Sequence, residues 1–179
     1  MTKNKLLSIK KIALLIAPIM FFGCYHSLAA PEQVFTQNQK TQEEVVKTLQ
    51  KLAQYEIDGS FLINQCLDNL TNQALKGKIQ VIGSEYASNI KELSNLLIKY
   101  GGHTPDYTKD FKGYFMSGYA AMRGFTDEGA LKALDTNLKL ILKAFEASLS
   151  SPVPADVKGA IKNIYENNKK AVETIETQF

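Results

Sequence analysis

Five polar residues stand at or beside positions where a repeat of apolar residues predicts the buried face of a helix: Glu56, Glu85, Asn89, Asp135 and Asn168. Carboxylates that project from several helices into a bundle can hold a metal ion. Glu56, Glu85 and Asp135 would form an oxygen-only site, supported by Asn89 or Asn168, and such a site suits hard ions. This hypothesis implies iron or manganese as the cofactor.

The number and the positions of the histidines argue against this metal site. Di-iron sites in helix bundles combine glutamates from two helices with a Glu-x-x-His pair from each of the other two. The chain has two histidines, His26 in the N-terminal segment and His103 in a predicted loop. The third residue after Glu85 is Ser88, so no such pair can form there. The leading interpretation is therefore a protein without a cofactor.

Three roles remain open for Glu56. Burial of an uncompensated carboxylate is costly, so the group must protonate or find a partner. In the leading interpretation Glu56 reaches water past Gly59, pairs with a lysine, or accepts a hydrogen bond from Asn89 or Asn168. The alternatives are a metal ligand and a group that transfers protons.

Other catalytic arrangements are missing from the sequence. No predicted helix carries a histidine, which argues against a Ser-His-Asp triad. The chain contains no phosphate-binding glycine loop and no Cys-x-x-Cys motif. Cys66 has apolar neighbours, so we expect a buried, unreactive thiol. We therefore predict no catalytic residues, and an enzyme is not the expected class.

Helical periodicity accounts for most of the chain. Apolar residues recur at alternating steps of three and four over residues 41–70, 73–100, 126–149 and 155–176, with a shorter helix predicted at 111–125. No segment shows the alternation of a strand. The short first and last connections favour antiparallel helix pairs, and the long middle connection can return the chain along the bundle. These features predict an all-α, ferritin-like four-helix bundle with an extra short helix in the middle connection.

Residues 1–29 have the pattern of an export signal. Four lysines precede the apolar run 12–22, which is eleven residues long and shorter than the roughly 20 residues that span a membrane. Two processing routes compete: cleavage after Ala29, or lipidation of Cys24 in a lipoprotein-type signal. An uncleaved N-terminal anchor is a third alternative. We therefore expect residues 1–29 as signal peptide, 30–40 as a flexible tether and 41–179 as the bundle.

The charge of the chain excludes one class of partner. Residues 1–29 hold four of the 21 basic residues and none of the 18 acidic ones, which leaves 17 basic and 18 acidic residues and a net charge of −1. A near-neutral body offers no electrostatic basis for binding nucleic acid. Contact with a membrane is expected only through a lipid on Cys24.

Several short motifs resemble a known family. They are the Leu-x-x-Leu run before Glu56-Ile57-Asp58-Gly59, the segment 96–102 that ends in Gly-Gly, the paired prolines at 152 and 154, and the Asn-Asn run in the last predicted helix. Over residues 45–175 the chain resembles a bacterial ferritin-like four-helix family, the domain of unknown function 2383. This resemblance implies a four-helix bundle and ancestral metal-site geometry, with no established activity.

The chain departs from this family pattern where metal ligands would be expected. Family members often carry acids on the third helix and a histidine–aspartate pair on the last. The corresponding positions here read Asp135 and Leu138, then Asn168 and Lys169. We therefore expect an exported, non-enzymatic bundle of the periplasm or cell envelope that binds an unidentified protein or small molecule. A ferritin-like metal-binding protein or oxidase is the alternative.

Overall fold

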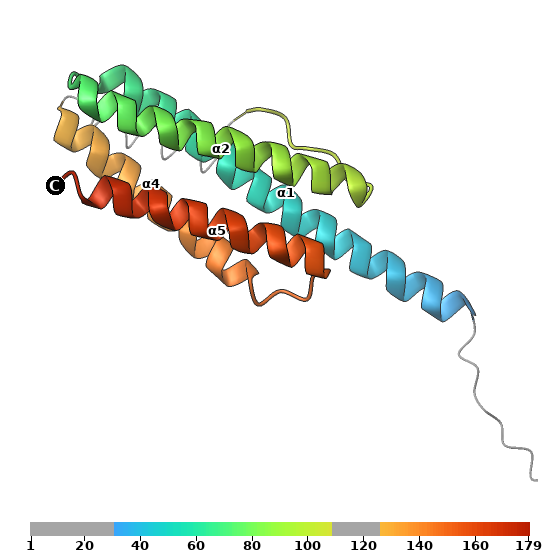
Figure 1. Ribbon diagram of the computed structural model, residues 1–179. Coiled ribbons are helices and arrows are strands. Elements are labelled where there is room, and N and C mark those ends of the chain that lie inside the picture. Colours follow the sequence, from blue (N-terminus) through green and yellow to red (C-terminus); the bar gives the residue numbers. More distant parts are fainter. Residues whose placement is uncertain (1–30, 109–125) are drawn as a thin grey trace, which may run out of the picture.

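The computed structural model of the chain describes residues 31–108 and 126–179, with side chains from residue 41 onward. Within these ranges the regular elements are α1 (Pro31–Asn69), α2 (Gln73–Lys99), α4 (Asp127–Ser148) and α5 (Ala155–Glu176), and none is a strand. The predicted all-α four-helix bundle is confirmed (Figure 1). The signal segment, Cys24 and the short helix predicted at 111–125 lie outside the described residues.

Contacts between helix ends establish the topology. Asp127 at the start of α4 accepts hydrogen bonds from the backbone amides of Thr71 and Asn72, which join α1 to α2. At the opposite end, Lys99 of α2 pairs with Asp156 of α5. Consequently α2 and α4 run in one direction and α1 and α5 in the other (Figure 1). The end of α2 and the start of α4 therefore lie at opposite ends of the bundle, which agrees with the predicted return of the chain between these two helices.

Local signals fix most helix boundaries. The Asn72 side chain caps α2 by accepting from the amides of Ala74 and Leu75, and the Thr126 side chain caps α4. Gly101 follows α2 with φ of 76°, a conformation that side chains other than glycine disfavour. These boundaries agree with the predicted ones.

The predicted start of α1 is wrong. The sequence predicted a tether over residues 30–40 and a capped helix from Thr41, whereas α1 begins at Pro31. Proline is well suited to the first helical turn, because its φ is already helical and its missing amide proton has no partner there. Once a helix has nucleated, each further residue adds a hydrogen bond. The early turns of α1 consequently extend past the end of the bundle (Figure 1).

The four helices enclose one apolar core. Along α1 the predicted seam is buried throughout: Val45, Leu49, Leu52, Glu56, Gly59, Ile63, Cys66 and Leu70. The seams of α4 and α5 are buried in the same way, apart from the half-buried Leu149. Among the described residues, none of the helices has the length and apolarity needed to cross a membrane.

Candidate functional site

Glu56 lies in the centre of the bundle and its side chain is 0% exposed. Its Oε2 accepts a hydrogen bond from Asn89 Nδ2 of α2 at 3.0 Å. Its Oε1 accepts one from Asn168 Nδ2 of α5 at 2.7 Å. The amide of Asn167 extends the group by donating to Asn89 Oδ1 at 3.2 Å. We refer to Glu56, Asn89, Asn167 and Asn168 as the Glu56 cluster.

The cluster connects α1 and α5, two helices that do not pack on each other directly. Both α2 and α4 contact α1, and both also contact α5, whereas α1 and α5 lie on a diagonal of the bundle. The Asn168–Glu56 hydrogen bond therefore crosses the centre of the core. The sequence hypothesis that Glu56 hydrogen-bonds to Asn89 or Asn168 agrees with this geometry, since both residues are buried donors.

A glycine one turn after Glu56 makes room for a tyrosine. A Cβ atom at Gly59 would come within 2.5 Å of Tyr86 Cε1 and 2.8 Å of Ile141 Cδ1. Tyr86 is 1% exposed and is one of the largest side chains in the core. Glycine at position 59 thus lets the aromatic ring of α2 pack directly on the backbone of α1, beside the Glu56 cluster.

Burial dominates the protonation of Glu56. Removal of the carboxylate from water raises its pKa from 4.5 to about 7, although the hydrogen bonds from Asn168 and Asn89 favour the charged form. No described lysine, arginine or histidine forms an ion pair with it. The charge of Glu56 also helps to raise the pKa of Tyr86, after the larger effect of burial on that phenol.

Some buried polar atoms of the described core have no hydrogen-bond partner in the protein. They are Tyr86 Oη, Asp135 Oδ1, Asn137 Nδ2 and Asn168 Oδ1. Such atoms are uncommon in folded proteins, and each one needs a physical explanation. Asn168 Oδ1 belongs to the same amide that donates to Glu56, so the cluster contains an acceptor without a donor.

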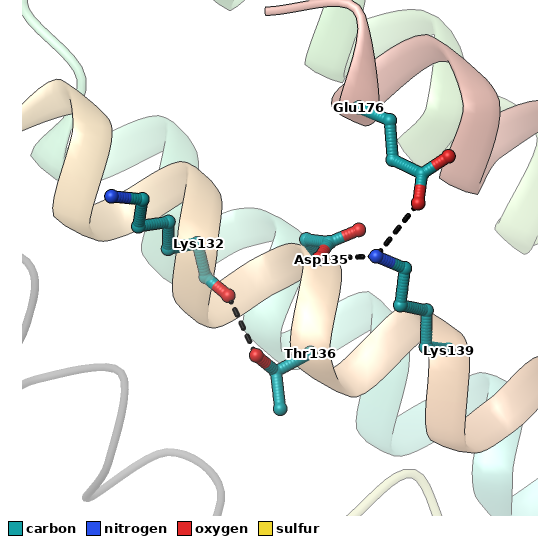
Figure 2. A network of polar contacts seen from close by, with 5 residues as sticks. All are labelled: Lys132, Asp135, Thr136, Lys139 and Glu176. Atoms are coloured by element: carbon teal, nitrogen blue, oxygen red, sulfur yellow. Dashed lines mark hydrogen bonds and ion pairs between the residues drawn. The ribbon is translucent and has the colours of Figure 1, made fainter. Parts of the chain in front are cut away.

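The other two predicted carboxylate ligands lie apart from this cluster. Glu85 is partly exposed on α2. Asp135 Oδ2 pairs with Lys139 Nζ at 2.8 Å, and Lys139 also pairs with Glu176 of α5 at 2.7 Å (Figure 2). In the part of the chain that the structure describes, no three or more histidine, cysteine, aspartate or glutamate side chains are grouped as metal ligands. The carboxylates of Glu56, Glu85 and Asp135 therefore do not converge.

A surface hollow of about 500 Å³ lies where α2 ends, beside residues 42–50 of α1. Its lining includes Glu43, Val46, Lys47, Gln50, Tyr100 and His103. The Gln50 side chain holds the connection in place by donating to the His103 carbonyl oxygen at 3.3 Å. A pocket of this volume is within the usual range for ligand sites, about 300–1,000 Å³, and its lining is both apolar and charged.

The chain matches a known protein family. Residues 44–151 match the family described as domain of unknown function (DUF2383), which is more than half of the 179-residue chain. The chain belongs to the DUF2383 family. No curated protein matches it.

The DUF2383 match ends before α5, which begins at Ala155. The resemblance read from the sequence extended to residue 175, so the family match is shorter than expected. Glu56 and Asn89 lie within the matched range, and the hollow starts at its edge. Asn167 and Asn168 lie beyond it, so one half of the Glu56 cluster comes from a helix outside the match.

The sequence did not reveal every polar group in the core of this DUF2383 protein. Asn137 is buried on α4, and its position three residues after Leu134 on the apolar stripe could have identified it. Asn167 lies beside the predicted seam rather than on it, and nothing in the sequence marked its role. The buried thiol predicted at Cys66 is present, and burial raises the pKa of this thiol to about 12.

Proposed function

We propose that this DUF2383 protein is an exported helical bundle that acts in the cell envelope by binding a partner, and that the hollow beside His103 is its binding site. The proposal rests on the difference in solvent access between the hollow, which a partner can reach, and Glu56, which is buried. The hollow is open to solvent and lies beside residues 42–50 of α1. Glu56 is sealed in the core, and each of its oxygens already accepts an amide proton.

Export is supported by the lysine-rich, apolar pattern of residues 1–29. Intact-mass measurement of the protein from its native cells tests this part of the proposal. Cleavage after Ala29 yields a chain that begins at Ala30, whereas a lipoprotein begins at an acylated Cys24 and is heavier. A mass equal to that of the uncleaved chain would contradict both routes.

The described surface does not favour a large apolar interface. The exposed large apolar residues are few and are spread over four parts of the described chain: Val81 and Ile98 on α2, Tyr107 in the connection, Leu140 on α4, and Phe179 at the C-terminus. A partner is therefore expected to bind through a small mixed surface, for which the hollow provides apolar walls at Val46 and Tyr100 and charges at Glu43 and Lys47.

Site-specific photo-crosslinking in the native cells tests the binding site. A photoreactive amino acid at position 47 lies in the lining of the hollow. One at position 162 provides a matched control, because Lys162 is exposed on α5 and does not belong to the lining. We expect a discrete adduct from position 47 and none from position 162. The absence of an adduct at 47, or the same adducts at both positions, would contradict the proposal.

A metal-binding role is the second candidate. It is favoured by the buried carboxylate of Glu56 together with two buried oxygens that lack partners, Asn168 Oδ1 and Tyr86 Oη. Elemental analysis of protein purified from its native compartment distinguishes the candidates. Stoichiometric iron or manganese that is lost in Glu56→Ala would support a metal site and count against the binding role proposed above.

A further inference from the structure

Glu56 is the one described carboxylate that is completely buried, and its partners are uncharged. In an interior of this kind a carboxylate either keeps its charge through strong hydrogen bonds or takes up a proton. The Glu56 cluster has groups that suit both states. We infer that the Glu56 cluster is an internal proton-binding site, and that its two states differ in the orientation of the Asn168 amide.

The ionised state fits the contacts in the structure. Both carboxylate oxygens accept amide protons, from Asn89 and from Asn168, and hydrogen bonds to a charged acceptor are the stronger kind. This arrangement leaves Asn168 Oδ1 buried without a donor. The ionised state therefore has two defects, a buried charge without a counter-ion and an unpaired acceptor.

The protonated state removes the buried charge, and one movement gives Asn168 Oδ1 a donor while Asn168 Nδ2 takes the place of the unpaired oxygen. A proton from solvent binds Glu56 Oε1, and the neutral acid gains an O–H donor. Rotation of the Asn168 amide by half a turn exchanges its nitrogen and oxygen, which places Oδ1 where Nδ2 now lies, 2.7 Å from Oε1. The new O–H can then donate to Oδ1, while Asn89 still donates to Oε2.

No described cation forms an ion pair with Glu56. On α1 the nearby acid is Asp58, which is also buried and accepts a hydrogen bond from Gln54. From α2 the titratable neighbours are Tyr86, whose phenol is held neutral by burial, and Glu85, whose charge acts on the same phenol. From α4 the close side chain at this level is the apolar Ile141 beside Gly59, and the acidic Asp135 of that helix is engaged by Lys139. From α5 the facing groups are the uncharged amides of Asn167 and Asn168. Burial raises the pKa of Glu56 to about 7, which supports proton exchange close to neutral pH.

The test is an NMR titration of the isotope-labelled protein from about pH 4 to about pH 9, a range that brackets the ordinary and the raised pKa. The two signals to follow are the Glu56 Cδ shift and the Asn168 side-chain amide. We expect both to change with one common midpoint near 7. A Glu56 midpoint near the ordinary value of 4.5, or no titration, would overturn the proton site. A Glu56 titration with an unchanged Asn168 amide would overturn the reorientation.

Three variants make the assignment specific. In Glu56→Gln, which is isosteric with the protonated acid, the Asn168 amide should become independent of pH. Glu146→Gln is the matched control, because Glu146 is exposed on α4, and it should leave both titrations unchanged. Asn168→Ala removes a donor that favours the charged form, so the Glu56 midpoint should move upward. A downward or absent shift would contradict the assigned role of Asn168, and this result does not depend on the folding of Glu56→Gln.

Discussion

The residues around Glu56 show how a helix bundle accommodates a carboxylate in its core. Two amides from two other helices provide hydrogen bonds, and these offset part of the cost of removing the charge from water. Gly59 complements this arrangement on the next turn of α1, because any side chain there would collide with Tyr86. Position 59 therefore serves packing, while position 56 provides the central polar contact.

Alanine substitution at two glycines separates packing from helix propensity. Gly59→Ala should destabilise the bundle by about 1–3 kcal/mol, the usual cost of overpacking a core, since its Cβ would lie 2.5 Å from Tyr86 Cε1. Gly77→Ala, the control on α2, has no atom within 4 Å of the new Cβ and should stabilise by up to about 1 kcal/mol. Urea unfolding of both variants measures the difference. Equal effects would show that Gly59 has no special packing role.

At the scale of the elements, one acidic side chain joins three helices. Asp127 in the first turn of α4 accepts from the Thr71 amide at 2.7 Å and from the Asn72 amide at 2.9 Å. These amides belong to the turn between α1 and α2. The hydrogen bonds from Thr71 and Asn72 lower the pKa of Asp127, so the contact is made in its ionised form at neutral pH.

Removal of this carboxylate should loosen the turn selectively. In Asp127→Ala we expect the backbone amides of Thr71 and Asn72 to exchange with solvent faster and the urea midpoint of unfolding to fall, because the two donors lose their acceptor. Asp106→Ala is the control, since Asp106 is exposed in the connection after α2. Hydrogen exchange read by NMR checks the result. Unchanged protection at both amides would show that other contacts hold the turn.

The same elements show what could be predicted from the sequence. The boundaries of α2, α4 and α5 were predicted because Asn72, Thr126, Gly101 and the prolines near 154 act locally, within one or two residues of the helix ends. The start of α1 was not, since the polar residues 31–40 neither stop a helix nor show an apolar stripe. The partners of Glu56 depend on the register between helices, which periodicity along one helix does not give. The sequence therefore offered Asn89 and Asn168 as candidates but not the geometry that joins them.

At the scale of the whole molecule, two sets of carboxylic acids make the stability of the fold depend on pH in opposite directions. Asp127, Glu128 and Asp156 have lowered pKa values in the fold, to about 2 for Asp156, because they accept hydrogen bonds. The unfolded chain binds their protons more tightly, so their contribution is present above the ordinary pKa and is lost as the pH falls. Glu56 behaves in the opposite way. Its pKa is raised in the fold, so the folded chain binds the proton more tightly, and stability falls as the pH rises from 4.5 to about 7.

These opposing effects predict a maximum of stability in mild acid, near pH 4, rather than at neutral pH. The decline above the maximum should level off above about pH 7 and amount to roughly 3 kcal/mol, at about 1.4 kcal/mol for each pKa unit of the Glu56 shift. Urea midpoints measured across this range provide the check. Glu56→Gln should remove the decline between 4.5 and about 7 but keep the loss at lower pH, whereas Glu146→Gln should keep both. A wild-type profile that rises through that window would contradict a raised pKa for Glu56 in the folded bundle.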